Sequence, residues 1–262
     1  MHTQSVHFRC SVTGTVYYSA MKILQLNIWG GKLGKQIIEL IEREKPDVIC
    51  FQEVVVIPGN ENLFISSLEE ITKMTGYTHS FFSPSFAFKL MNRRAEWGNA
   101  IVSNMPFITS NSQFTRGEFK DDFDILDGDY NMRNLQHVEL ERDGKKLHVL
   151  NHHGHHIHQH KMGDAETLRQ CEMIVEYISK LEGDVVLAGD FNLAPESESL
   201  GKLNAILVNH AMESGVTTTR TPLTHKTEVC DYIFTSKELK TAGFKVLPDL
   251  VSDHAALVIE VE

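Results

Sequence analysis

The chain contains the stretch KILQLN at residues 22–27, which a helix-like segment connects to PDVICFQE at residues 46–53. A second pair of stretches repeats this design. Here KLHVLN at residues 146–151 is connected by another helix-like segment to GDVVLAGD at residues 183–190. Apolar runs of this kind are typical of strands that are buried on both faces. The sequence therefore predicts two strand–helix–strand units, and this duplication indicates an α/β fold.

Each unit places polar residues where its strands end. The first strands close on Asn27 and Asn151, and the second strands close on Glu53 and Asp190. Proteins of the α/β class commonly bind ligands at the carboxyl ends of their strands. We therefore expect these four residues to meet at one site, and their oxygen atoms suit a hard cation such as Mg²⁺.

The composition is that of an ordinary folded protein. The 262 residues, 42% hydrophobic and 23% charged, suffice for a substantial core in one large domain or two small ones. A net charge of −10 argues against a protein that wraps nucleic acid through a broad basic surface, but not against an enzyme that holds one or two phosphates. No apolar run approaches the roughly 18 residues of a membrane span.

The N-terminal segment and the cysteines bear on location. Residues 1–20 have no continuous apolar run, so we predict a tail or the product of an upstream start codon rather than a signal peptide, with one folded domain over residues 21–262. Four cysteines without a CxxC pair are too few for a disulfide framework in a chain of this length. We predict a cytoplasmic monomer without a membrane span.

The periodicity predicts the remaining elements. Amphipathic segments predict helices at 31–45, 66–74 and 164–181. Strand-like runs occur at 98–103, 133–140, 146–152, 230–235 and 255–261. The Asp-Gly pair at 143–144 predicts a hairpin, and the polar stretch 104–131 predicts a surface loop with possible strand pieces. Many strands with few helices between them indicate a layered α/β fold.

Five short polar motifs stand in order along the chain. They are Asn27, Gln52-Glu53, GDFN at 189–192, CDYI at 230–233 and SDH at 252–254. This ordered set resembles the endonuclease/exonuclease/phosphatase superfamily, which includes pancreatic-type DNases, abasic-site endonucleases, tyrosyl-DNA phosphodiesterases, inositol polyphosphate phosphatases and neutral sphingomyelinases. The resemblance covers residues 21–262 and implies a four-layer α/β sandwich, in which two facing mixed β-sheets are flanked by helices.

The resemblance implies a metal site beside a water-activating pair. Glu53 would be the main ligand of Mg²⁺ or Mn²⁺, with Asn27 and Asp253 close to the metal, directly or through water. Asp190 would orient or deprotonate the attacking water. Asn192 would hold that water or a phosphate oxygen.

The resemblance also implies two catalytic histidines. His254 would contact the scissile phosphate and be held in place by Asp231. His153 looks like the second histidine of the family, although Gly154 stands where the family usually has an aliphatic residue, which leaves the choice between His152 and His153 open.

Four further candidates lie outside these motifs. Glu96 resembles the acid that pairs with the second histidine in pancreatic-type DNases, although an ordinary surface acid is an alternative. Asn99 lies on a motif that the family often places near its active site. Arg133 opens a strand and could reach a phosphate, or lie on the surface. We include Asn99, Arg133 and Asn151 as substrate-binding candidates.

Phosphate ester hydrolysis requires stabilisation of negative charge and a water placed in line, and these groups can supply both. We predict a metal-dependent phosphoesterase that hydrolyses phosphodiester bonds in nucleic acid. The alternatives are a phosphatase or phospholipid diesterase acting on inositol phosphates or sphingomyelin-like substrates, and a non-catalytic metal-binding or interaction module.

A run of six histidines at residues 152–160 is open to three interpretations. It could be an active-site loop in which one or two histidines matter, a solvated loop, or a second site for Zn²⁺, Ni²⁺ or Cu²⁺. A dedicated site for such metals would normally show cysteine or a fixed helical spacing, so the first interpretation is favoured. Trp29 and Trp97 could stack on a base or belong to the core.

Overall fold

The computed structural model describes residues 20–57, 68–126, 128–142 and 144–262. Its first sheet contains, in spatial order, β11 (Thr241–Val246), β12 (Leu257–Val261), β1 (Met21–Asn27), β2 (Val48–Val56), β4 (Arg93–Ser103) and β3 (His79–Leu90). The second sheet contains β5 (Thr109–Arg116), β6 (Arg133–Arg142), β7 (Lys145–His153), β8 (Asp184–Asp190), β10 (Asp231–Ser236) and β9 (Leu207–Asn209). The helices are η1 (Trp29–Gly31), α1 (Gly34–Glu44), α2 (Leu68–Thr75), α3 (Ala165–Ile178), α4 (Glu198–Ile206) and α5 (His210–Glu213).

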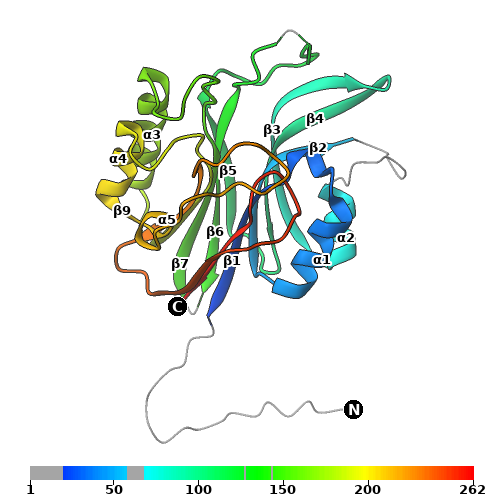
Figure 1. Ribbon diagram of the computed structural model, residues 1–262. Helices are drawn as coiled ribbons and strands as arrows, with labels where there is room; N and C mark the ends of the chain where they lie inside the picture. Colours follow the sequence, from blue (N-terminus) through cyan, green and yellow to red (C-terminus); the bar gives the residue numbers. More distant parts are fainter. Residues whose placement is uncertain (1–19, 58–67, 127, 143) are drawn as a thin grey trace, which may run out of the picture.

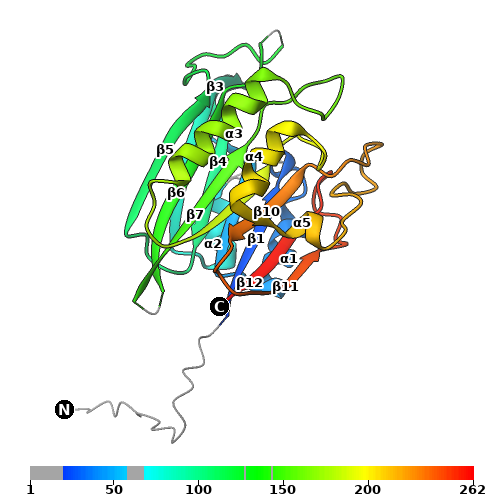
Figure 2. The ribbon, with the colours of Figure 1, turned by 90° about the vertical axis from the view of Figure 1, so that its left-hand side faces the viewer.

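The predicted duplication is confirmed. The unit β1–α1–β2 lies at the centre of the first sheet and the unit β7–α3–β8 at the centre of the second, each with its two strands in parallel. The other ladders between the described strands are antiparallel, so both sheets are mixed. Figures 1 and 2 show α1 and α2 on one flank, α3 and α4 on the other, and the two sheets between them. This is the predicted four-layer sandwich.

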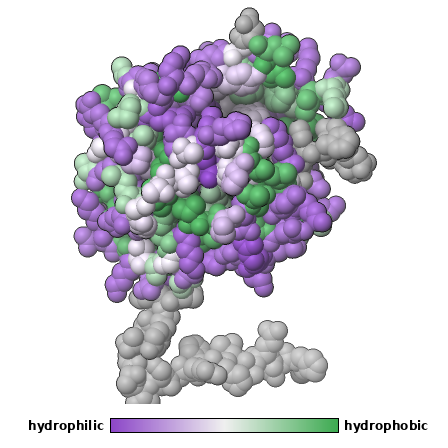
Figure 3. All heavy atoms as spheres, in the orientation of Figure 1, coloured by the Kyte–Doolittle hydropathy of each residue, from purple (hydrophilic) through white to green (hydrophobic). Residues whose placement is uncertain are grey.

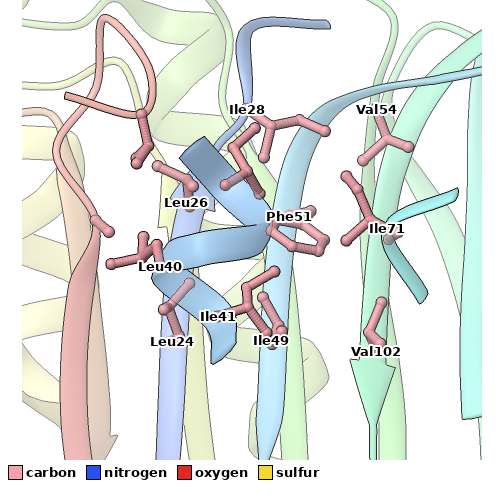
Figure 4. Close-up of a cluster of buried hydrophobic side chains, with 14 of the residues drawn as sticks. Leu24, Leu26, Ile28, Leu40, Ile41, Ile49, Phe51, Val54, Ile71 and Val102 are labelled. Carbon is pink, nitrogen blue, oxygen red and sulfur yellow. The ribbon is translucent and has the colours of Figure 1, made fainter. Parts of the chain in front are cut away.

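Strand alternation separates three of the four hydrophobic clusters of the described residues. Ile23 and Cys50 pack between the sheets with Val149 and Val186, whereas side chains at the intervening positions pack outward under the helices. Figure 4 shows the outer cluster of the first sheet, in which side chains from β1, β2 and α1 pack together.

The same alternation carries polar residues onto the inner faces. Counting in twos from Ile23 along β1 leads to Asn27, and counting from Val186 along β8 leads to Asp190. The inner face is thus apolar in its middle and polar where the parallel strands end. The polar strand ends of both sheets therefore face each other, and this arrangement forms the site.

Several predictions of elements need adjustment. The predicted helices correspond to α1, α2 and α3, and the stretch expected to be mostly loop contains the eight-residue strand β5. Strands β3, β9 and β11, the short helix η1 and helices α4 and α5 were not predicted from the sequence. Arg142 pairs with Lys145 across the predicted hairpin, although Asp143 lies outside the described residues, as do residues 1–19 of the predicted tail.

The surface of the face seen in Figure 3 is mostly hydrophilic, with apolar side chains in separate patches. Within the described ranges, the helices are all too short or too polar to cross a membrane.

Candidate active site

Glu53 lies in a bulge of a strand rather than at its end. We predicted that the strand would end on this residue, but β2 continues to Val56, and its pairing with β4 shifts register between Phe51 and Val54. The prediction was wrong in this detail because the valines that follow continue the ladder beyond the bulge. Glu53 has a left-handed backbone (φ 57°), which is uncommon outside glycine, and it lines the cleft described below.

Asp190 closes β8 in a tightly packed turn. A Cβ atom on the preceding Gly189, whose φ is 153°, would lie 1.9 Å from the carbonyl oxygen of His152, so only glycine fits there. The Asn192 N–H donates to Asp190 Oδ1 over 2.9 Å, and Lys161 Nζ donates to Asn192 Oδ1 over 2.7 Å. These bonds hold the predicted acid and amide side by side at the strand end.

His254 and Asp231 form the predicted pair. His254 Nδ1 lies 3.0 and 2.9 Å from the two carboxylate oxygens of Asp231, and its Nε2 lies 3.6 Å from Asp190 Oδ2. Gln25 and Thr219 donate to Asp231 over 3.1 and 2.7 Å and hold it in place. Burial lowers the pKa of His254, but the carboxylates of Asp231 and Asp190 outweigh this effect and raise it well above its ordinary value.

Of the two candidate histidines, His153 lines the cleft and His152 does not. His153 Nε2 lies 3.7 Å from Asp190 Oδ2, and its Nδ1 lies 3.4 Å from Arg133 Nη1. A guanidinium can only donate, so Nδ1 accepts and the proton resides on Nε2, toward Asp190. Burial and the neighbouring Arg133 lower the pKa of His153 well below its ordinary value.

Gly154, the departure from the family pattern, has a steric explanation. A Cβ atom at this position would lie 2.3 Å from the carbonyl oxygen of Phe191. The Gly154 N–H donates to the Asp190 carbonyl oxygen over 2.7 Å. The chain after β7 therefore passes too close to the chain after β8 for a larger residue.

The acids and amides fit a hard divalent cation. Asn27 Nδ2 donates to Asp190 Oδ2 over 3.2 Å, and the Asn27 oxygen accepts one bond from the Trp29 N–H, which leaves it a second lone pair. Burial raises the pKa of Glu53, and the charges of Asp190 and Asp253 raise it further, while His254 and Asn27 oppose them. Carboxylate and amide oxygens are the donors that Mg²⁺ or Mn²⁺ prefers, and Glu53, Asp190 and Asp253 line one cleft with Asn27 bonded to Asp190.

These side chains surround one cleft of about 360 Å³. Seven of the twelve predicted site residues line it: Glu53, Arg133, His153, Asp190, Asn192, Asp253 and His254. Asn27 and Asp231 contact cleft residues from beneath. Burial lowers the pKa of Arg133 to about 10, which leaves this guanidinium charged near neutral pH.

Asn99 and Asn151 are not on the cleft wall, contrary to their assignment as substrate-binding residues. Asn151 donates to the Phe51 carbonyl oxygen and to Gln136 over 2.8 and 3.0 Å, and it accepts from Gln52 over 2.7 Å. Asn99 donates to Asn134 over 3.0 Å, and all of these side chains are buried. The amides thus bridge the two sheets under the cleft, and their bonds are already used within the protein.

Glu96 does not pair with His153 either. Within the described part of the chain, its carboxylate contacts Arg94 over 2.9 Å and lies outside the cleft lining. The local match to the family placed it on β4 next to Trp97, which does line the cleft, but strand alternation directs adjacent side chains to opposite faces.

Sequence reasoning missed two cations at the site. Arg220 contacts His254 Nε2 and lies 3.7 Å from Asp253, and Lys161 holds Asn192. Both are buried, and the Nε atoms of Arg220 and Arg133 have no hydrogen-bond partner among the residues that the structure describes. Neither cation belongs to a motif that could have identified it, although Lys161 directly follows the histidine run.

The histidine run does not form a metal cluster. Among the described residues, one group of potential ligands converges, Asp190, Cys230, Asp231 and His254, and it includes no histidine of the run. In that group Asp231 and His254 bind each other, and burial raises the pKa of the Cys230 thiol to about 11. The interpretation of the run as a second transition-metal site is therefore not supported.

His152 provides a prediction about stability. Its ring packs against Phe191 and its Nδ1 lies 3.1 Å from the Asn134 carbonyl oxygen. Burial lowers its pKa from 6.5 to about 4. The folded protein thus favours the neutral form, so the stabilisation is complete above about pH 6.5 and is lost as the pH falls toward about 4. Between about pH 7.5 and about pH 5 this residue should remove about 2 kcal/mol from the free energy of unfolding.

Urea unfolding at these two pH values checks the prediction. His152→Gln should be less stable than the parent near pH 7.5 and should lose less stability on acidification. The exposed His225→Gln is the matched control and should keep the parent's pH dependence. An unchanged pH dependence in His152→Gln would show that this imidazole is not the titrating group.

Comparison with known proteins agrees with this geometry. The sequence matches the model of the Endonuclease/Exonuclease/phosphatase family over residues 24–254. No curated protein matches the chain. A family protein from Leptotrichia buccalis has a similar structure (19% identity, TM-score 0.69), with 93% of this chain and 100% of that chain covered.

Two similar structures carry functional names. A mannosyl-6-phosphatase from Bacteroides thetaiotaomicron is 14% identical with a TM-score of 0.70, and the match covers 92% of this chain and 99% of that one. TDP2 from D. rerio, in complex with a single-strand DNA product, is 15% identical with a TM-score of 0.67, and the match covers 93% and 99%. At these identities the similarity shows the shared fold. The family match spans most of the sequence, and the chain therefore belongs to the endonuclease/exonuclease/phosphatase family of phosphoric ester hydrolases.

Proposed function

We propose that this protein hydrolyses phosphodiester bonds in nucleic acid with the help of Mg²⁺ or Mn²⁺. The observation that carries the proposal is the position of Asp190. Its Oδ2 atom lies 3.6 and 3.7 Å from the Nε2 atoms of His254 and His153, and Asn27 donates to it over 3.2 Å. A carboxylate between two imidazoles, in a cleft that Glu53 and Asp253 also line, suits a water that attacks a phosphate.

Glu53, Asp253 and Asn27 would hold the cation. When bound, the cation would stabilise the negative charge of the transferring phosphoryl group. Glu53 is the centre of this set because it is the carboxylate that the bulge of β2 aims into the cleft.

Asp190 would orient the attacking water, and it would not take a proton from that water early in the reaction. Burial alone would raise the pKa of Asp190, but His254, His153, Arg220 and Lys161 lower it well below its ordinary value. Asp190 therefore stays ionised, and an ionised carboxylate accepts a charge-assisted hydrogen bond from water. The Asn192 oxygen accepts from Lys161 and its Nδ2 donates to the Gly154 carbonyl oxygen over 3.4 Å, so Asn192 would offer its second amide N–H to the water or to a phosphate oxygen.

His254 and Arg133 would stabilise the phosphate. The carboxylates beside His254 raise its pKa, so it would be protonated once a phosphate oxygen lies between its Nε2 and Arg220, and both groups would then donate to that oxygen. Arg133, whose Nε lacks a hydrogen-bond partner in the described part of the chain, would donate to a phosphate oxygen from the side of His153. His153, neutral with its proton on Nε2, would donate to the leaving group or to another phosphate oxygen.

Nucleic acid is the favoured substrate because aromatic and cationic side chains share the cleft. Trp29 and Trp97 line it together with Arg133, Arg220 and Lys226. Bases stack on aromatic rings, and phosphates bind cations. The structural similarity to a protein determined with a DNA product is consistent with this choice.

The test compares two substrates that differ in the number of ester bonds at phosphorus. Thymidine 5′-(p-nitrophenyl phosphate) is a diester and p-nitrophenyl phosphate is a monoester. We expect a higher kcat/KM for the diester. A preference for the monoester would instead favour a phosphatase, the activity named for the neighbour from B. thetaiotaomicron.

His254 and Asp231 should act as one unit on the phosphate. Asp231 reaches the substrate only through the imidazole that it holds at 2.9 Å. His254→Ala and Asp231→Ala should each lower kcat by about tenfold or more, and the double variant should be no worse than His254→Ala alone. Steady-state kinetics of the three variants check this, and losses that multiply in the double variant would show that the residues act independently.

A further inference from the structure

A second, smaller cavity of about 160 Å³ adjoins the cleft. The two cavities share three lining residues, His156, His158 and Lys226. The histidine run thus leads away from Asp190, and its side chains form a wall that continues beyond the proposed reaction centre.

Hydrogen bonds and a ring contact fix the positions of the residues in this wall. The His156 N–H donates to Asn131 Oδ1 over 2.8 Å, and Asn131 Nδ2 donates back to the His156 carbonyl oxygen over 3.3 Å. The rings of His156 and His158 meet edge to face with centroids 4.5 Å apart. Lys161 also lines the small cavity, is 8% exposed and donates to Asn192, which lines the main cleft.

The small cavity is cationic. Two ammonium groups, Lys161 and Lys226, line it against one carboxylate, Glu228, and three histidines add imidazole N–H groups. Burial lowers the pKa of His156 to about 3, so this imidazole would donate as a neutral group. This lining contrasts with the oxygen donors around Glu53 at the other end of the cleft. In a chain of net charge −10, cations gathered on one cavity favour an anionic ligand.

We propose that His156, His158, Lys226 and Lys161 form a second anion subsite, which binds a phosphate group of the substrate next to the scissile one. The inference rests on the proposed phosphodiester hydrolysis and adds a substrate class, namely esters that carry a further phosphate near the bond to be cleaved. Ammonium and imidazole N–H groups donate to phosphate oxygens through charge-assisted hydrogen bonds. The extra phosphate can come from the next link of a nucleic acid strand or from a terminal phosphate of a small molecule.

Three matched substrates test the subsite. The first is thymidine 5′-(p-nitrophenyl phosphate), the second bears an added 3′-phosphate, and the third bears the same 3′-phosphate capped as a methyl ester. We expect the added phosphate to raise kcat/KM about tenfold or more. A stronger effect of the uncapped phosphate identifies a terminal phosphate as the source, and an equal effect of both identifies the next link of a strand.

The triple variant His156→Gln/His158→Gln/Lys226→Met should bring the ratio of kcat/KM for the second substrate over the first close to one. Two controls should keep the parent's ratio. His225→Gln removes an exposed neighbour of Lys226 that lines neither cavity, and Lys202→Met removes a cation of α4 that pairs with Glu172. Equal kcat/KM values for the first two substrates in the parent would overturn the subsite. A triple variant that keeps a higher kcat/KM for the second substrate would overturn it as well.

A binding measurement separates this inference from the proposed function. Calorimetry should show thymidine 3′,5′-bisphosphate binding at least tenfold more tightly than thymidine 5′-monophosphate to the parent, with the difference lost in the triple variant. This result would support the subsite even if no substrate were turned over, in which case only the proposed function fails. Equal affinity for the two ligands, or a Zn²⁺ requirement for the difference, would refute the subsite.

Discussion

Replacing Asp190 by Asn should lower kcat for phosphodiester hydrolysis by about a thousandfold or more. The change is nearly isosteric at the end of β8, but it removes the charge that faces both His153 and His254. An amide accepts more weakly than a carboxylate and cannot hold the attacking water against two imidazoles. Because KM depends on groups elsewhere in the cleft, we expect the loss to be largely in kcat.

Asp184→Asn, at the opposite end of the same strand, is the matched control. It should leave kcat within a few-fold of the parent. Steady-state kinetics and thermal melting of both variants check the prediction. If Asp190→Asn also keeps kcat within a few-fold while remaining folded, the water-orienting role belongs to another residue.

Glu53→Gln should lose most of its activity at low Mg²⁺ and recover part of it at high Mg²⁺. The substitution keeps the shape of the side chain but removes the carboxylate that the bulge of β2 aims into the cleft. A weakly held hard cation depends on such a charge, so the Mg²⁺ concentration for half-maximal activity should rise about tenfold or more.

Mg²⁺ titrations of turnover in the parent and in Glu53→Gln measure this shift. Glu42→Gln, on the exposed side of α1, serves as the control and should titrate like the parent. The same half-maximal Mg²⁺ concentration in Glu53→Gln and the parent would mean that Glu53 does not hold the metal.

The duplicated units explain why the fold could be predicted from the sequence. Each unit encodes both its strand positions and its polar strand ends locally, which predicted a layered α/β fold and the convergence of Asn27 with Asp190. The family resemblance of the ordered motifs implied the four-layer sandwich. Elements with weaker periodicity were not predictable in this way. Strand β11 is largely exposed, and β5 lies at the edge of its sheet in a polar stretch.

A site residue could be predicted from the sequence only where a short motif by itself determines the position of that residue. The bulge at Glu53 depends on the pairing of β2 with β4, which no local pattern encodes. Asn151 has the same place in its unit as Asn27, but its amide is used by Gln136 and by the Phe51 carbonyl oxygen between the sheets. Arg220 and Lys161 reach the site from loops, whose course depends on tertiary contacts.

The metal requirement of phosphodiester cleavage tests the central claim most directly. The parent would be assayed on thymidine 5′-(p-nitrophenyl phosphate) as purified, after exhaustive chelation, and after Mg²⁺ or Mn²⁺ is returned, with Asp190→Asn assayed alongside. We predict that chelation abolishes turnover, that the returned cation restores it in the parent, and that no cation restores it in Asp190→Asn. Turnover that survives chelation, or that is equal in the two proteins, would contradict the account.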